Sequence, residues 1–296
     1  MLWLGVDYCA HWAGAFSHGF WVIEYVNSKS VAVAKAEVSF SHQPMSYLMD
    51  NKPRPIVNER IDYKPTGPRE KFIVPLLRSH IEGALKDYAA PAALPFTRAL
   101  DVGCGRQPFR TLLESFGYSF TGMDVQQNPE NTVDFIGAID EVLPEGLVSR
   151  GPFHFILCTE VMEHVANWDQ AFKNLTVLLE RGGRLLITCP QFYRLHEEPY
   201  DFWRPTLHAL RYFGGRSGFR TLHDVAAGGA WDVLGTLLAD CLPYSSSDRV
   251  AARVSTKLVS LSMRVLLQLL YHGGLQRTVR LRSAHYLSNV IVFECR

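Results

Sequence analysis

The sequence predicts an α/β fold in which a doubly wound sheet of seven mostly parallel strands carries helices on both faces. Two observations predict it. From about Glu70 onward, short apolar runs alternate with stretches of helical periodicity, the pattern of parallel strands joined by crossover helices. A turn rich in glycine follows the first apolar run, at the place where such sheets open their ligand crevice.

The individual elements follow in a regular order along the chain. Strands are predicted at residues 98–102, 119–125, 133–136, 153–158, 185–189, 219–224 and 289–294. Helical spacing of apolar residues is clearest at 72–85, 168–179 and 249–271, and Arg181-Gly182-Gly183 is expected to stop the second of these helices. Seven strands with intervening helices correspond to a Rossmann-like architecture.

The region before this alternation has a different character. Pro53 and Pro55 resemble a linker, so we predict an N-terminal extension of unclear role at 1–55 and a single domain at 56–296. The extension holds Cys9, His11 and His18, but three such residues without a fourth partner do not make a convincing metal site. We therefore predict no metal.

The composition of the chain indicates which kinds of partner and which cellular compartment to expect. Lys and Arg number 30 against 29 Asp and Glu, and a net charge of +1 gives no reason to expect nucleic acid. No uncharged apolar stretch reaches the roughly 18 to 20 residues needed to span a bilayer, so the chain is not expected to be integral to a membrane. Six scattered cysteines favour a reducing, cytoplasmic setting.

The turn after the first strand is the strongest candidate for a ligand site. Gly103 and Gly105 let the backbone turn sharply and approach a ligand, although a tight turn without a ligand is the alternative. Asp124 ends the next strand 23 residues after Asp101, where a carboxylate can accept hydrogen bonds from a ribose. A dinucleotide site usually has a third glycine where this chain has Pro108, and Asp101 suits an ammonium group better than a pyrophosphate.

Four segments, at 99–105, 122–124, 158–165 and 178–190, resemble successive motifs of the class I S-adenosylmethionine-dependent methyltransferases, of the type 11-like kind found in small-molecule and polysaccharide pathways. The resemblance covers about residues 97–220. It implies S-adenosylmethionine as the only cofactor, with Asp101, Gly103 and Gly105 facing its methionine part and Asp124 holding its ribose. Ala138 stands where the family often has an acid near the adenine, so backbone contacts or Asp140 would serve there. The remaining residues implied at the cofactor are Val125, Ile139, Thr159 and Glu160.

The loop after the fourth strand carries a first group of candidate catalytic residues. It resembles the Glu-Val-x-Glu-His element of small-molecule methyltransferases, in some of which the pair equivalent to Glu163 and His164 lies by the acceptor. Glu160 and His164 would share one helical face if a helix has begun there. The alternative is that these side chains cap the helix and order the cofactor pocket.

The loop after the fifth strand carries a second group. Its Glu-x-Pro-Tyr-Asp-x-x-Arg-x-Thr pattern, residues 197–206, is similar to one in bacterial methyltransferases of polysaccharide and secondary-product pathways, which implies a hydroxyl acceptor. His196 is the candidate general base and Asp201 a further catalytic candidate. In the alternative, Asp201 and Arg204 pair to brace the loop while Thr206 caps the next helix.

Together these observations predict a biosynthetic O-methyltransferase acting on a hydroxyl of a small-molecule or glycan-like acceptor. N- or C-methylation, for example of a quinone ring, a dinucleotide oxidoreductase and a catalytically silent scaffold are the alternatives. The apolar residues of the helix at 249–271 are expected to serve core packing or a homodimer contact. Peripheral docking on a membrane or a lipid-linked substrate is the alternative use of that helix.

Overall fold

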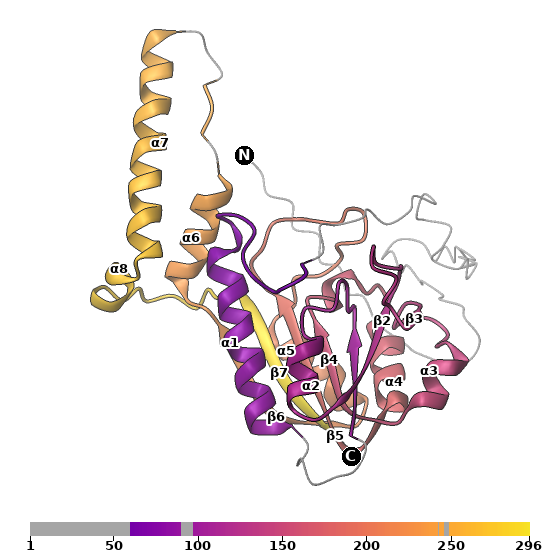
Figure 1. Cartoon of the computed structure of the whole chain (residues 1–296). Coiled ribbons are helices and arrows are strands. Elements are labelled where there is room, and N and C mark those ends of the chain that lie inside the picture. Colours follow the sequence, from indigo (N-terminus) through magenta and orange to yellow (C-terminus); the bar gives the residue numbers. More distant parts are fainter. Residues whose placement is uncertain (1–59, 90–96, 242, 246–248) are drawn as a thin grey trace, which may run out of the picture. The chain divides into compact units, whose positions relative to one another are not determined.

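The computed structural model describes residues 60–89, 97–241, 243–245 and 249–296, so the extension at 1–55, its linker and its Cys and His residues lie outside the described range. Figure 1 shows the arrangement of the described elements around one sheet. The sheet has seven strands in the order β3-β2-β1-β4-β5-β7-β6. The predicted doubly wound α/β architecture is therefore confirmed.

All seven predicted strands form, and the sheet is parallel except for β7, which runs antiparallel between β5 and β6. Their bounds are β1 Arg98–Val102, β2 Ser119–Asp124, β3 Phe135–Ile136, β4 Phe153–Thr159, β5 Leu179–Pro190, β6 Phe219–Ala227 and β7 Ser288–Cys295. The largest difference from prediction is β5, which starts six residues early. Its pairing with β4 shifts register between Phe153 and Phe155, and Gly182, at φ +80°, lies in that irregular stretch rather than in a loop.

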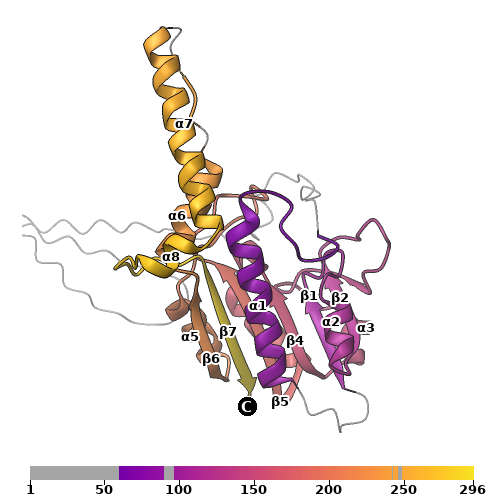
Figure 2. The same cartoon turned by 60° about the vertical axis from the view of Figure 1, so that its left-hand side comes forward.

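The helices are α1 Glu70–Tyr88, α2 Arg110–Ser115, α3 Glu145–Arg150, α4 Trp168–Leu178, α5 Leu207–Arg216, α6 Ala230–Asp240, α7 Val250–Tyr271 and α8 Gly274–Thr278. A short 3-10 turn, Met162–His164, precedes α4. The helices predicted at 72–85, 168–179 and 249–271 correspond to α1, α4 and α7. Figure 2, turned from the first view, shows α1 lying across one face of the sheet.

The core forms two layers because the central strands are buried on both faces. Along β4, Ile156 and Cys158 pack into a cluster with α4, whereas Phe155 and Leu157 pack into a second cluster with α1. Alternate side chains of a strand point to opposite faces, so the near-continuous apolar run of β4 serves both layers. This two-sided burial leaves the carboxyl ends of the strands as the open edge where a site can form.

The long helix α7 departs from the expectation of core packing. Of its 22 residues, Leu270 alone is buried, and the stripe of apolar side chains that begins at Val250 faces solvent. The prediction that this stripe packs into the core is therefore wrong. The carboxyl end of the helix does pack into the second core cluster, through Leu266, Leu267, Leu270 and Tyr271. Among the described helices, none is both long enough and apolar enough to cross a membrane.

Candidate active site

The turn after β1 is tied to the end of the neighbouring strand β2. Gly103 adopts φ +70° and Gly105 φ +49°, both in the left-handed region that glycine enters without strain. The Gly103 N–H donates to the Met123 carbonyl at 2.8 Å, and the Gly105 N–H donates to Oδ2 of Asp124 at 2.9 Å. The turn therefore holds the Asp124 carboxylate at the edge of the sheet.

A cavity of about 830 Å³ opens at the carboxyl ends of β1, β2 and β4. Every residue predicted to hold the cofactor lines it: Asp101, Gly103, Gly105, Asp124, Val125, Ala138, Ile139, Thr159 and Glu160. Two of the four catalytic candidates, His164 and His196, line the same cavity. The structure thus brings cofactor and catalytic candidates to one place.

Asp101 is the most informative group in the cavity wall. Its side chain is 1% exposed, and neither carboxylate oxygen has a hydrogen-bond partner among the described residues. Burial, with a smaller contribution from the charge of Asp124, raises the pKa of Asp101 well above its usual value. A buried carboxylate without a donor is costly, so the site is suited to a ligand that brings a cation or N–H groups to it. The amino group of S-adenosylmethionine has this chemistry.

At the part of the cavity lined by Ala138, the neighbouring acidic residue already has a hydrogen-bond partner. Asp140 lines the cavity, but its Oδ2 accepts the backbone N–H of Asn167 at 3.0 Å and so helps to fix the start of α4. Of the two options open for this end, the engagement of Asp140 favours backbone contacts from Ala138 and Ile139.

Glu160 and His164 were expected to share one helical face if a helix had begun at Glu160. Glu160 does not lie in a helix, so the two residues do not share such a face. Its backbone adopts φ +54°, and its N–H donates to the Thr188 carbonyl at 3.0 Å. The hydroxyls of Thr188 and Ser288 donate to its Oε1 at 3.0 and 3.3 Å. Burial raises the pKa of Glu160 to about 7, against the lowering effect of these hydroxyls. Strain in a non-glycine residue is typical of functional sites, and here the hydrogen bonds to β5 and β7 sustain it.

Glu163 and His164 lie in the 3-10 turn, and neither caps α4. That cap is Asn167, whose side-chain oxygen accepts the Gln170 N–H at 3.1 Å. Nδ1 of His164 is 3.0 Å from the Tyr200 carbonyl, which can only accept, so Nδ1 carries the proton and Nε2 is left with a lone pair in the neutral ring. Oε1 of Glu163 lies 3.7 Å from that Nε2. Burial, followed by the charge of Glu160, raises the pKa of Glu163 well above its usual value.

His196 is held by Asp201 from the next segment of the loop. The His196 N–H donates to Oδ2 of Asp201 at 2.9 Å, and its ring Nδ1 is 3.3 Å from the same oxygen. Arg204 donates to both carboxylate oxygens of Asp201, at 2.5 and 2.6 Å. Burial opposes ionisation of Asp201, but the hydrogen bonds of Arg204 and of the His196 N–H outweigh it and lower the pKa of Asp201.

The structure therefore contains the pair of Asp201 and Arg204 that braces the loop, and Asp201 also contacts and orients His196. Asp201 does not line the cavity, and neither does Glu163. Thr206 occupies the N-cap position of α5, but its side chain makes no capping hydrogen bond.

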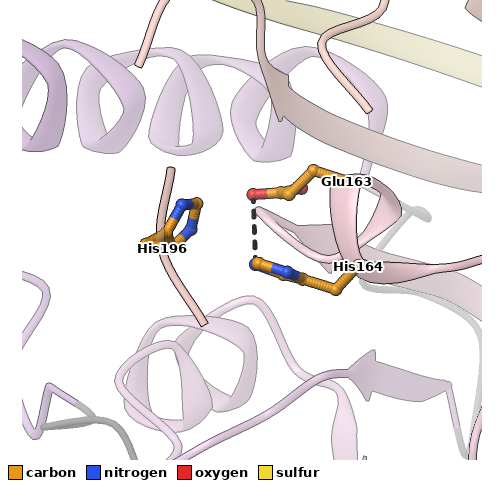
Figure 3. Close-up of side chains that lie close together, drawn as sticks. All are labelled: Glu163, His164 and His196. Atoms are coloured by element: carbon orange, nitrogen blue, oxygen red, sulfur yellow. Dashed lines mark ion pairs between the residues drawn. The ribbon is translucent and has the colours of Figure 1, made fainter. Parts of the chain in front are cut away.

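Figure 3 shows Glu163, His164 and His196 side by side, although 32 residues separate the two histidines. The rings meet edge to face with centroids 4.7 Å apart. Burial, then the neighbouring His164, lowers the pKa of His196, while Asp201 has a smaller raising effect. One ligand atom from each of the three side chains lies within 4.8 Å of the others, a spacing that would admit a cation.

Comparison with known proteins decides the family. A model of the methyltransferase domain family matches residues 75–225, just over half of the chain. The chain belongs to this family. It is a class I S-adenosylmethionine-dependent methyltransferase, as the motif resemblance predicts, and S-adenosylmethionine is its cofactor.

The relatives of this methyltransferase are distant. A ubiquinone biosynthesis O-methyltransferase of Caulobacter vibrioides is 27% identical over 114 residues, which cover 34% of this chain and 44% of that protein. The match thus spans less than half the length of the curated relative. A S-adenosylmethionine-dependent methyltransferase structure from Archaeoglobus fulgidus aligns with 14% identity and a TM-score of 0.44, over 73% of this chain and 94% of the other. Geranyl diphosphate C-methyltransferase from Streptomyces coelicolor aligns with 12% identity and a TM-score of 0.46, over 79% and 84%.

Gly103 provides a direct test of the turn in this methyltransferase. A Cβ at Gly103 would lie 2.2 Å from Cγ2 of Val161, in addition to the strain of φ +70°. We expect Gly103→Ala to lower the free energy of unfolding by about 1 to 3 kcal/mol and to weaken binding of S-adenosylhomocysteine at least about 10-fold.

Gly117 is the matched control for this substitution. It has φ +86°, but a Cβ there would meet nothing within 4 Å. Gly117→Ala should therefore cost about 1 kcal/mol through backbone strain alone and leave ligand affinity unchanged. Chemical denaturation and calorimetric titration measure both quantities. Equal effects of the two substitutions on affinity would contradict a ligand-facing role for Gly103.

The sequence-based prediction did not select several polar and aromatic residues of the cavity wall, among them Arg60, Tyr63, Tyr193 and Glu197. Arg60 bonds Glu70 at 2.5 Å and places its guanidinium 5.5 Å from the ring centre of Tyr63, which packs in turn on Phe109. The segment before α1 thereby forms one wall of the site. The density of aromatic and ionisable residues at 193–204 was a usable signal for Tyr193 and Glu197, but nothing in the local pattern marks Arg60 or Tyr63.

Proposed function

We propose that this methyltransferase transfers a methyl group to a hydroxyl of a small-molecule or glycan-like acceptor, as part of a biosynthetic pathway. The observation that carries the proposal is His196, a cavity-lining imidazole oriented by a buried carboxylate. Its lowered pKa leaves the ring neutral near pH 7, the state that accepts a proton. The O-methyltransferase name of the Caulobacter relative supports the same acceptor atom.

The cofactor would be held at the turn after β1. We assign the amino group of S-adenosylmethionine to Asp101, its ribose to Asp124, and its adenine to the backbone around Ala138 and Ile139. Gly103 and Gly105 allow the close approach, and Val125, Thr159 and Glu160 complete the wall. When bound, the cofactor supplies an electrophilic methyl group.

The acceptor would lie on the side of the cavity where His164 and His196 meet. With Nδ1 of His196 directed at Asp201 and at the Arg194 carbonyl, Nε2 is available to remove the hydroxyl proton as the new carbon–oxygen bond forms. Asp201 and Arg204 then act as positioning residues, because they hold the imidazole without lining the cavity. The ring of His164 packs edge to face against the His196 imidazole, with Oε1 of Glu163 3.7 Å from Nε2 of His164.

We also propose a cytoplasmic setting and the domain division at 55/56. Cys104, Cys158, Cys189, Cys241 and Cys295 are free thiols, and four of them are buried, which suits a reducing compartment.

The proposal is tested with matched acceptors that differ at one atom. Catechols, hydroquinones and sugars are each paired with the amine analogue and with the already O-methylated compound, and formation of S-adenosylhomocysteine is measured with product mass. We expect turnover with at least one free hydroxyl compound and none with its methyl ether. Transfer only to amines or to ring carbon would contradict the hydroxyl acceptor while leaving the family assignment intact.

A further inference from the structure

The exposed face of α7 has no part in the proposed reaction. Six apolar side chains recur every three or four residues, which places them on one side of the helix: Val250, Val254, Leu258, Leu261, Val265 and Leu269. Each is between 50% and 76% exposed. The stripe runs for about 30 Å at 1.5 Å per residue. A continuous apolar stripe of this length marks an interaction surface.

The segment that carries this stripe has charged side chains of one sign. Between residues 249 and 285 the chain has no Asp or Glu, although the whole protein is almost neutral at +1. The same segment holds seven cationic residues: Arg249, Arg253, Lys257, Arg264, Arg277, Arg280 and Arg282. Arg253, Lys257 and Arg264 are spaced by four and seven residues and so follow one edge of the stripe. A partner for this face must offer apolar surface and negative charge together.

We propose that α7 and the segment to residue 285 dock on the surface of an anionic lipid bilayer. The helix would lie in the interface, with its apolar stripe among the acyl chains and its basic edge at the phosphate headgroups. A second copy of this chain fits the face less well, because two α7 helices packed stripe to stripe would bring their basic edges close together. This inference does not depend on which acceptor the enzyme methylates.

Contacts with the rest of the fold hold α7, and with it the apolar stripe, in a defined position. Leu266 and Leu267 pack into the core cluster that contains α1, and α7 also packs along α6. At the carboxyl end of α6, Ala239 lines the cavity and Asp240 forms an ion pair with Arg69 at 2.6 Å. Figures 1 and 2 both show α7 continuing beyond this end of α6. Docking would therefore place the bilayer near the end of α6 that lines the cavity.

The test is flotation of the full-length protein with vesicles of phosphatidylcholine alone or of phosphatidylcholine and phosphatidylglycerol at about 2:1. We expect at least about 10-fold stronger partitioning onto the anionic vesicles, decreasing as salt is raised. The double substitutions Leu258→Asp/Leu261→Asp and Lys257→Gln/Arg264→Gln should each weaken that partitioning about 10-fold or more. Val177→Asp and Lys173→Gln, on the exposed side of α4, are the matched controls and should change nothing.

Several results would overturn the docking surface. They are failure of the wild-type protein to float with anionic vesicles, equal partitioning of the α7 and α4 variants, or a lipid-free dimer that Leu258→Asp/Leu261→Asp dissociates. Hydrogen exchange at 250–265 as slow without lipid as in α4 would show instead that the chain itself covers the stripe. Binding of S-adenosylhomocysteine by every variant verifies that the fold is intact, and a failed acceptor screen would leave the flotation result standing.

Discussion

Asp101→Asn is expected to weaken binding of S-adenosylmethionine by about 100-fold or more, because a buried charge pair with the amino group of the ligand becomes a neutral contact. The side chain is almost fully buried, and neither oxygen has a donor among the described residues, so no other contact of Asp101 would obscure the loss. Calorimetric titration with the cofactor and with S-adenosylhomocysteine measures it. Asp169→Asn, which removes an exposed carboxylate 3.4 Å from Arg216, should leave affinity unchanged.

The same substitution should have the opposite effect on the ligand-free protein. Because the folded-state pKa of Asp101 is raised, the unfolded chain gives up this proton at lower pH than the folded protein does. The contribution of Asp101 to stability is thus fully present below its unfolded pKa, near 4, and is lost as pH rises towards the raised folded value. We expect the free energy of unfolding of Asp101→Asn to change less with pH over this range than that of the wild-type protein. A variant that binds normally, or is less stable than wild type at neutral pH, would refute the role given to Asp101.

His196→Ala is expected to lower kcat by about 100-fold or more while leaving the affinity for S-adenosylhomocysteine within about twofold, because it removes the base and not the cofactor wall. Steady-state kinetics with the acceptor found by the matched screen, together with titration of the nucleoside ligand, separate the two effects. His164→Gln tests the neighbouring imidazole. If His164→Gln abolishes turnover and His196→Ala does not, the base is His164.

The pH profile distinguishes a catalytic His196 from a structural one. Activity should rise with pH through the pKa of His196 and reach its plateau once the ring is neutral, below the usual imidazole value near 6.5, because burial lowers that pKa. In Asp201→Asn the nearby negative charge is lost, so the pKa of His196 should fall further and the acid limb should move to lower pH. A merely bracing Asp201 would reduce activity without moving the limb.

Much of the scaffold could be predicted because its determinants are local. The apolar run at 153–158 and the flanking helical periodicities identify β4 and its crossovers, and the glycines at 103 and 105 mark a turn that only small residues allow. Prediction of α7 as a helix succeeded for the same reason. Its expected packing into the core was wrong, because periodicity reports which side chains share a face and not what covers that face.

The site depended more on contacts between distant segments. His164 and His196 come from separate loops, and Glu160 adopts a left-handed backbone that Thr188 and Ser288 stabilise from two other strands. Arg60 and Tyr63 reach the cavity through contacts with Glu70 and Phe109. No pattern of nearby residues specifies such contacts, since they form only when the strands are in register.

By itself, the sequence determined the order of strands and helices along the chain, the family, and two carboxylates, Asp101 and Asp124, that line the cavity, because motif spacing and side-chain period are properties of short stretches of chain. Only the tertiary structure decided which polar groups lack partners, which imidazole a carboxylate orients, and which apolar stripe is left uncovered. The reason is physical: burial, pKa and exposure are set by every segment that packs around a side chain, and those segments lie far apart in the sequence.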